Sequence, residues 1–369
     1  MGNMGKDIFF DFARSCVDAA DIDAVYLANY PEEAKWAPLV AVELYEYGRV
    51  DIPGDVPWID HLKDIPPIPE GLDGIIKSAA KTSGAAIAVT GSRQAIVSAK
   101  AGLGFFKENQ KPEILFLAAD SQTYQADMKK LENLDFYICN INSADSSKQE
   151  SSVLSEVLPL LRKKYGDESR LLNFDIADSA SSILSPASLF LLSARGVNIN
   201  EIAAGARLEP VQGTYNFVPQ ACGDIGTGKE HLLPASYIPA KYYTIIRSMM
   251  LKQGKSDEII LWLDPRFEAF ALWLKYLFDE NPTGLSVVYE KLLPGSAVPA
   301  QNFFETILDF GDNASTEEGQ NNKTLITEIS RKRSAAGSPI LRVELPDGSP
   351  HSYGRLVALF SRGSRMLWK

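Results

Sequence analysis

The chain has 369 residues, of which 45% are hydrophobic and 23% are charged. That length exceeds what one compact core usually holds, and the composition excludes a chain that is mainly disordered. The 47 acidic residues outnumber the 37 Lys and Arg residues, and the resulting net charge of −10 disfavours nucleic acids and anionic membranes as partners.

The cysteines, the histidines and the first residues predict a cytoplasmic protein without a metal site. Cys16, Cys139 and Cys222 lie far apart, so they form neither a disulfide framework nor a metal cluster, and the three histidines are isolated from one another. The first residues lack the basic-then-apolar pattern of a secretory signal. No window approaches the roughly 18 unbroken apolar residues of a membrane-spanning helix, so we expect no membrane partner.

Residues 1–80 predict a helical N-terminal arm followed by a proline-rich connector. Apolar residues recur at helix-like spacings in 7–28 and 35–48. Five prolines follow in the segment up to residue 80. Because proline removes a backbone donor and fixes φ, this segment is predicted to be an extended connector. These prolines are Pro53, Pro57, Pro66, Pro67 and Pro69.

Residues 81–213 predict a first α/β subdomain. Short apolar runs bounded by turn residues alternate with helix-compatible stretches, which is typical of a parallel sheet covered on both faces. The predicted strands are Ala86–Gly91, Glu113–Ala118, Phe136–Asn142 and Leu171–Ala177, and the predicted helices include 93–107 and 152–164.

Residues 214–369 predict a second α/β subdomain of the same kind. The predicted strands are Glu258–Asp264, Leu285–Glu290, Thr324–Ile329 and Ile340–Pro346, the predicted helices include 265–278 and 303–310, and 311–324 is interpreted as a polar surface loop. The fold class is therefore α/β, with two doubly wound parallel-sheet subdomains after the helical arm. In such sheets ligands bind beyond the carboxyl ends of the strands.

Neither a nucleotide-binding motif nor a serine-hydrolase motif is complete in the sequence, so we expect no nucleotide cofactor and no serine hydrolase. Gly223–Lys229 matches the spacing of a phosphate-binding P-loop, but the next residue is Glu230 rather than Ser or Thr, and Pro234 soon interrupts a following helix. We interpret this segment as a glycine-rich turn between subdomains. The G-x-S-x-G pattern of a nucleophile elbow is absent.

Two loops at predicted strand ends can bind an anion. The first is Thr90-Gly91-Ser92, whose backbone amides precede a helix, and the second is 142–147, which is rich in hydroxyl groups. Each has an alternative interpretation, because such residues also shape strand–helix turns and cap helices, as Asp145 or Ser146 would.

The segment Ser182–Ala206 resembles the signature of the glucose-6-phosphate isomerase family. That signature is a serine-containing turn, a long apolar helix, and then an acidic helix of small residues that ends in Gly-Ala. Other segments follow in the family's order, from its Gly-Gly-Ser turn to its late strands, and the resemblance covers roughly residues 80 to 360. These segments are Val89–Ser92, Ile141–Glu150, Pro265–Glu280, 322–327 and Ile340–Pro346. The short bacterial forms and those fused to transaldolase are the most similar.

The resemblance implies a function and a set of site residues. Members of this family interconvert glucose 6-phosphate and fructose 6-phosphate in glycolysis and gluconeogenesis, through an enediol, without a metal or cofactor. Glu280 falls on the catalytic Glu of the family, Ser146 and Ser147 fall on its phosphate-binding Thr pair, and Gly91 with Ser92 falls on its first turn. Asn142 belongs to the phosphate loop, and Asn302 occupies the position of the family's His. A sugar phosphate and a second copy of the chain, as a homodimer, are the implied partners.

Several residues depart from the family pattern and keep an alternative function open. Ala180 stands at the position of the charge-stabilising Arg, and Asp145 replaces the glycine of the phosphate loop. Asn302, or Phe304 in a shifted register, replaces the His, and Lys369 does not match the family's C-terminal Lys. The alternative is a catalytically impaired relative that binds a phosphorylated carbohydrate or a protein partner.

Overall fold

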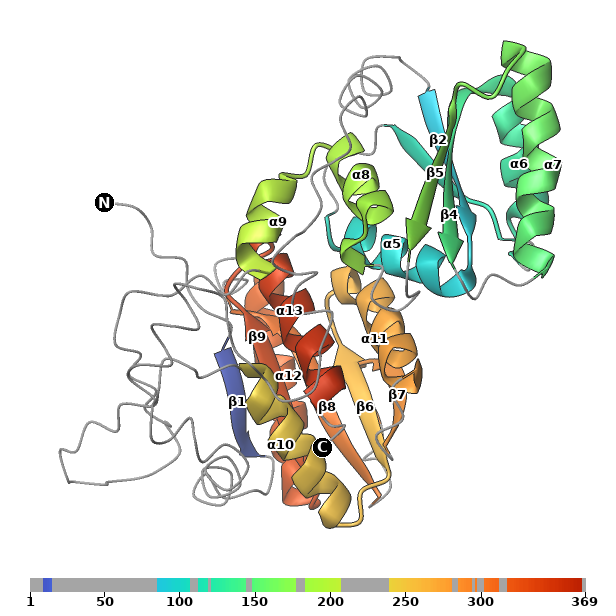
Figure 1. Ribbon diagram of the computed structural model, residues 1–369. Helices are drawn as coiled ribbons and strands as arrows, with labels where there is room; N and C mark the ends of the chain where they lie inside the picture. The colour runs from blue at the N-terminus through green and yellow to red at the C-terminus, as the bar shows by residue number, and fades with distance from the viewer. Residues whose placement is uncertain are drawn as a thin grey trace, which may run out of the picture. The chain divides into compact units, whose positions relative to one another are not determined.

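The computed structural model describes ten stretches of the chain and one single residue, and contacts divide the described residues into two units (Figure 1). The first unit holds the described parts of 64–200 together with Pro265–Glu280. The second unit holds 9–14 and the described parts of 201–264 and 281–369. The described residues are 9–14, 85–106, 112–118, 121–143, 148–176, 183–206, 239–280, 285–293, 296, 302–311 and 317–366.

The first unit is built on a four-stranded sheet in which all paired strands are parallel. Its strand order is β3-β2-β4-β5. Helices lie on both faces of the sheet, as Figure 1 shows, and this explains why the strands are apolar on both sides. The strands are β2 (Ala85–Gly91), β3 (Glu113–Phe116), β4 (Asp135–Ser143) and β5 (Leu171–Ile176). The helices are α5 (Arg93–Phe105), α6 (Tyr124–Asn133), α7 (Lys148–Tyr165) and α8 (Pro186–Ala194).

Each face of this sheet has its own apolar core. Ile87, Val89 and Cys139 point toward α5 and α8, where Ala95 and Phe190 pack against them. The alternate residues of the same strands point toward α6 and α7. That second core contains Ala86, Ala88, Phe136 and Ile138 together with Leu131, Val157 and Leu161 of the two helices.

The second unit repeats this topology and adds one antiparallel strand. Its five-stranded sheet has the order β1-β9-β8-β6-β7, so the parallel strands β9-β8-β6-β7 match β5-β4-β2-β3. β1 pairs antiparallel with β9 at the edge of the sheet. The strands are β1 (Phe9–Arg14), β6 (Asp257–Trp262), β7 (Ser286–Lys291), β8 (Phe303–Phe310) and β9 (Ile340–Leu345). The helices are α10 (Pro239–Lys252), α12 (Glu317–Ala335) and α13 (Pro350–Met366).

Helix α9 (Ile199–Ala206) meets α13 through a pair of glycines. A Cβ atom at Gly205 would lie 2.0 Å from the backbone oxygen of His351, and one at Gly354 would lie 2.1 Å from the backbone oxygen of Ile202. Both glycines therefore allow a backbone-to-backbone approach that no other residue permits. Glu201, at the start of this stretch of α9, already belongs to the second unit.

Helix α11 (Glu268–Glu280) follows β6 in the chain but belongs to the first unit, where it packs on α5. The short 3₁₀ helix η2 (Pro265–Phe267) precedes it. The rings of Phe105 and Phe267 meet edge to face with centroids 5.9 Å apart, and a Cβ at Gly104 would lie 3.5 Å from the Cβ of Ala269. The first unit is thus completed by residues that come late in the chain.

The structure confirms the α/β class and the two parallel-sheet subdomains and corrects three predicted elements. Residues 9–14 form strand β1 instead of part of a helical arm; the rest of 1–80 lies outside the described residues. Residues 303–310 form strand β8 rather than a helix. The predicted strand Thr324–Ile329, with part of the predicted loop 311–324, lies inside helix α12.

The two units divide the chain differently from the boundary expected at 213/214. Residues 201–206 join the second unit, because α9 packs against α13 there. Residues 265–280, expected in the second subdomain, join the first, because α11 packs on α5. None of the described helices is long and apolar enough to cross a membrane.

Candidate functional site at the carboxyl edge of the first sheet

The carboxyl edge of the first sheet, where its parallel strands end, contains a topological switch point. The chain passes from β2 outward to β3 and then returns past β2 to β4 and β5, so the connections that follow β2 and β4 diverge. Ligands of doubly wound sheets bind in the crevice outside such neighbouring strand ends. Gly91 and Ser92 follow β2 at this point, and 144–147 follow β4.

Gly91 is required by the close approach of β2 and β4. Its φ is 150°, a value that side chains rarely permit, and a Cβ there would lie 2.6 Å from the backbone oxygen of Ile141. Glycine therefore keeps the backbone of the first loop next to the end of β4.

Ser92 is the N-cap of α5 and is 2% exposed. Its Oγ accepts a hydrogen bond of 3.1 Å from the backbone N–H of Ala95. Ser92 therefore caps α5, whereas capping was predicted from sequence for Asp145 or Ser146 of the second loop, and the Ser92 hydroxyl retains one hydrogen to donate.

Five polar side chains form a connected network on this edge, which we call the amide ladder: Thr90, Asn140, Asn142, Asn173 and Asp175. The hydroxyl of Thr90 donates to Asn140 Oδ1 at 2.8 Å. Asn140 Nδ2 donates to Asn142 Oδ1 at 2.7 Å and to Asn173 Oδ1 at 2.9 Å, and Asn142 Nδ2 donates to Asp175 Oδ1 at 3.0 Å. Three strands therefore contribute to one hydrogen-bonded network.

Register places the amide ladder in two rows on one face of the sheet. Thr90, Asn140 and Asn173 are direct neighbours in the first row, and Asn142 faces Asp175 in the second. Thr90 and Asn140 are buried, whereas the other three members are exposed. On the same face, the rows below are apolar and buried under α6 and α7, so the polar rows mark where the packed core stops.

Two of these five residues were predicted from sequence as parts of anion-binding loops, Thr90 in the first loop and Asn142 in the second, whereas Asn140, Asn173 and Asp175 were not. The available signal was the alternation of polar residues at the ends of two neighbouring strands, Asn140 and Asn142 in β4, and Asn173 and Asp175 in β5. Strand periodicity of two places each pair on one face.

Glu258 in the second unit accepts hydrogen bonds in a fully buried network. Tyr243 and Thr306 donate to Glu258 Oε1 at 2.7 and 2.6 Å, and Arg247 Nη1 lies 3.2 Å from Oε2. Burial raises the pKa of Tyr243 well above its ordinary value, with the nearby Glu258 as the next cause, so the phenol stays a neutral donor. Glu258 lies near the amino end of β6, at the edge of the sheet opposite the carboxyl ends where doubly wound sheets generally bind ligands, which indicates a structural role.

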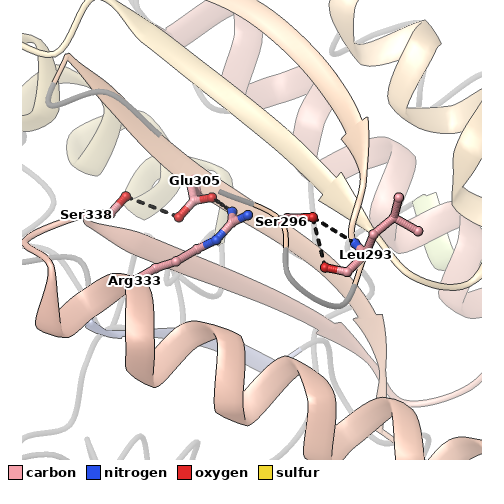
Figure 2. A network of polar contacts seen from close by, with 5 residues as sticks. All are labelled: Leu293, Ser296, Glu305, Arg333 and Ser338. Atoms are coloured by element: carbon pink, nitrogen blue, oxygen red, sulfur yellow. Dashed lines mark hydrogen bonds and ion pairs between the residues drawn. The ribbon is translucent and has the colours of Figure 1, made fainter. Parts of the chain in front are cut away.

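Figure 2 shows a second buried ion pair, in which Arg333 of α12 contacts Glu305 of β8. Ser338 donates to the other carboxylate oxygen of Glu305 at 3.1 Å. In the same view the hydroxyl of Ser296 donates to the carbonyl of Leu293, just after β7, at 2.9 Å. One carboxylate oxygen of Glu305 thus holds α12 to the sheet through Arg333, and the other holds the segment between α12 and β9 through Ser338.

A third charged cluster lies at the carboxyl ends of β8 and β9. Arg342 Nη2 is 2.5 Å from Asp309 Oδ2 and 2.8 Å from Glu344 Oε2. Gly311 leaves room for this cluster, because a Cβ there would lie 2.3 Å from Glu344 Oε1. One cation therefore binds both carboxylates.

The remaining predicted site residues fall in different places. Glu280 is the last residue of α11, in the first unit, and Ser146 and Ser147 lie outside the described residues. Asn302 precedes β8 at the amino end of its sheet, opposite the carboxyl ends where doubly wound sheets generally bind ligands. Its Nδ2 donates to Asp257 Oδ2 at 2.7 Å and to Ser256 Oγ at 3.0 Å.

Searches against known proteins find relatives at low identity, and no protein-family model matches the chain. A glucose-6-phosphate isomerase of Bacillus anthracis is 25% identical over 321 residues, which cover 70% of this chain and 67% of that protein. One of Bacillus cereus strain B4264 is 24% identical over 319 residues, with the same coverage. These relatives support a divergent relationship to the sugar-phosphate isomerases.

Solved structures show the same fold at still lower identity. A hypothetical protein of Thermus thermophilus superposes with a TM-score of 0.63 at 13% identity, covering 98% of this chain and 94% of that one. A glucose-6-phosphate isomerase of Chlamydia trachomatis superposes with a TM-score of 0.59 at 12% identity, covering 97% and 83%. Both likenesses concern the fold.

Proposed function

We propose that this chain, a divergent relative of the glucose-6-phosphate isomerases, is an aldose–ketose isomerase that interconverts glucose 6-phosphate and fructose 6-phosphate. The observation that supports this most is the switch point of the first sheet. Two loops that resemble the family's phosphate-binding turns follow β2 and β4 there, beside exposed hydrogen-bonding side chains. That combination suits a substrate with a phosphate at one end and hydroxyl groups along its length.

In this proposal the phosphate binds between the two loops. The backbone amides around Gly91 and Ser92 precede α5, and Ser146 and Ser147 precede α7, so each loop leads into the positive end of a helix. Hydroxyl groups at 146 and 147 donate to phosphate oxygens without adding charge. Local donors thus offset the acidic field of the whole chain.

Glu280 is the proposed base. Its carboxylate removes the proton from C2 of the open-chain aldose, and the electron pair of that C–H bond forms the C1–C2 double bond of an enediolate as the carbonyl electrons move to O1. The same group returns the proton to C1, and a proton passes from O2 to O1, which leaves the ketose. Atoms and electrons balance without a cofactor.

The test of this role is isomerase activity with Glu280→Gln. Fructose 6-phosphate is mixed with the protein, and glucose 6-phosphate is followed through a coupled dehydrogenase. We expect the variant to lose activity by at least about 10²-fold while it binds the sugar phosphate as before, since loss of a positioned base costs roughly 10²–10⁴ in rate. Glu268→Gln, an exposed residue in the first turn of the same helix, is the matched control. Unchanged turnover in Glu280→Gln would exclude it as the base.

The second candidate function is sugar-phosphate binding without turnover. Two features favour it: Ala180 replaces the charge-stabilising Arg, and Asn302 bonds to Asp257 and Ser256 at the amino end of its sheet. If the chain has this function, isothermal titration detects fructose 6-phosphate binding while the coupled assay stays silent at enzyme concentrations that would reveal a catalyst about 10⁵-fold impaired.

Asp145 provides a test of where the phosphate binds. A carboxylate in the loop between β4 and α7 repels phosphate, so Asp145→Gly should tighten fructose 6-phosphate binding by about tenfold in a titration. Asp167→Gly, at an exposed turn before β5, is the control for lost charge. Equal affinities of wild type and Asp145→Gly would place the phosphate elsewhere.

The homodimer implied by the family resemblance remains a prediction. Size-exclusion chromatography with light scattering measures it directly, and a monomer at all concentrations would contradict it. Location in the cytoplasm likewise remains a prediction from sequence.

A further inference from the structure

The amide ladder is directional, and Asp175 sets its direction. A carboxylate only accepts hydrogen bonds, so Asn142 must turn its Nδ2 toward Asp175 and its Oδ1 toward Asn140. Asn140 then donates from Nδ2, and its Oδ1 is left to accept from Thr90. One exposed acid therefore fixes which way each amide of the network points.

This arrangement leaves a defined set of groups unused on the exposed side. Among the described residues, no partner accepts from Nδ2 of Asn173 or from the second N–H of Asn142, and Asp175 Oδ2 receives no hydrogen bond. Asn140, by contrast, uses Oδ1 and both Nδ2 hydrogens. The exposed surface thus offers donors from two amides beside a carboxylate acceptor.

In the second sheet, the two residues at the equivalent position form an ion cluster instead of an exposed network. Asn142 and Asp175 face each other one residue before the ends of β4 and β5, as Asp309 and Glu344 face each other in β8 and β9. There Arg342 pairs with both carboxylates, and the side chains of the cluster are 8–19% exposed. The first sheet has no cation in this row among its described residues and keeps Asp175 exposed.

We propose that Asn142, Asn173 and Asp175 bind neighbouring hydroxyl groups of the sugar substrate, with Asn140 as the residue that positions them. A hydroxyl group both donates and accepts, so two adjacent hydroxyls match an amide donor beside a carboxylate acceptor. This inference rests on the proposed function, which it deepens by separating a hydroxyl subsite from the phosphate subsite. It assigns Asn142, which the family resemblance placed in the phosphate loop, to the hydroxyl subsite because Asn142 bonds to Asp175.

The charge of Asp175 indicates which end of the substrate binds at the amide ladder. The carboxylate of Asp175 repels a phosphate dianion and accepts from a neutral hydroxyl. The ligand end that meets the amide ladder is therefore the polyol end, and the phosphate lies toward the loops that begin α5 and α7.

The experiment measures binding to wild type, Asp175→Asn and Asn173→Ala with fructose 6-phosphate and with inorganic phosphate. We expect fructose 6-phosphate binding to weaken about 10- to 100-fold in Asp175→Asn and about fivefold in Asn173→Ala, and inorganic phosphate binding to stay within about twofold. All substituted residues are exposed. Glu132→Gln and Asn133→Ala, at the end of α6 just before β4 begins, are matched controls at the opposite edge of the same sheet.

A second readout uses sorbitol, a neutral polyol, and the side-chain amide signals of the ¹⁵N-labelled protein. The Asn173 signal is assigned by its disappearance in Asn173→Ala. Sorbitol should shift that signal in wild type, and Asp175→Asn should suppress the shift.

The outcomes separate this inference from the proposed function. Wild-type affinity for fructose 6-phosphate in both variants would overturn the hydroxyl subsite and leave the proposed function standing. Absent fructose 6-phosphate binding, with a sorbitol shift that depends on Asp175, would overturn the proposed function and support the subsite. If the protein shows neither fructose 6-phosphate binding nor the sorbitol shift, both the proposed function and the hydroxyl subsite are overturned.

Discussion

Glu258 is a buried carboxylate, and the cation of Arg247 offsets the free-energy cost of burying its charge. Tyr243 and Thr306 donate to one oxygen and Arg247 contacts the other, and both members of the ion pair have no exposed side-chain surface. Desolvating two such charges costs free energy that only their pairing and their hydrogen bonds offset. The pair therefore holds α10 against β6 as long as it is complete.

Arg247→Met should destabilise the protein by about 3–5 kcal/mol, because it leaves the Glu258 charge buried without its cation. Urea unfolding followed by circular dichroism measures the loss. Lys275→Met breaks the exposed Lys275–Asp279 pair and should change the free energy of unfolding by less than about 1 kcal/mol. Equal effects of the two substitutions would contradict the argument.

Residue types alone predicted part of the candidate site. Gly91 was predictable because strand–helix turns at sheet ends favour glycine, and the structure adds the reason, a 2.6 Å approach to Ile141. The amide ladder was harder to predict, because Asn140 and Asn173 meet only through the register of β4 and β5. Pairing of distant strands is a tertiary property that no local pattern contains.

Among the elements, β8 and α12 show why periodicity can mislead. Glu305 and Asp309 are four residues apart, a spacing that places side chains on one face of a helix and also on one face of a strand. β8 is buried from residue 304 to residue 310, and its two acids pair with Arg333 and Arg342. The cations that make a buried acidic strand possible lie far along the sequence.

The segment Thr324–Ile329 shows the opposite error. Its β-branched residues favoured a strand, but the flanking residues extend the helix to 19 residues. The hydroxyls of Thr324 and Thr327 donate to the carbonyls four residues earlier, at 2.9 and 2.8 Å, which lets both residues fit a helix. Ile326 and Ile329 then pack against the core of the second sheet.

Gly205→Ala should disrupt the contact between α9 and α13. The new methyl group would lie 2.0 Å from a backbone oxygen, so a helix must move, at a cost of about 1–3 kcal/mol that exceeds the gain in helix propensity. Thermal or urea unfolding measures the change. Gly104→Ala, where the nearest atom is a Cβ at 3.5 Å, should be neutral or stabilising by up to about 1 kcal/mol. A neutral Gly205→Ala would show that the helices separate easily.

At the scale of the whole molecule, the two units share one strand order and differ at their carboxyl edges. The first edge exposes amides and an acid, and the second is closed by an ion cluster around Arg342. The same topology therefore supports a candidate ligand site in one unit and an internally satisfied cluster in the other.

A fragment that ends at residue 200 should be less stable than the first unit within the whole chain. It lacks α11 and Phe267, so the face of α5 that contains Phe105 loses its cover. We expect such a fragment to bind a dye for exposed apolar surface and a synthetic peptide of residues 265–280 to reverse this. A fragment that is compact and indifferent to the peptide would contradict the prediction.

The position of α11 in the chain also sets an order of events during synthesis. A ribosome adds about 5–20 residues per second, so the segment 201–280 follows residue 200 by roughly 4–16 s. Throughout that interval the emerging first unit has every strand of its sheet but not its last helix. The nascent chain therefore passes through an unfinished state with an uncovered helix, and pausing of translation before residue 280 would lengthen the time in which that surface can meet a chaperone.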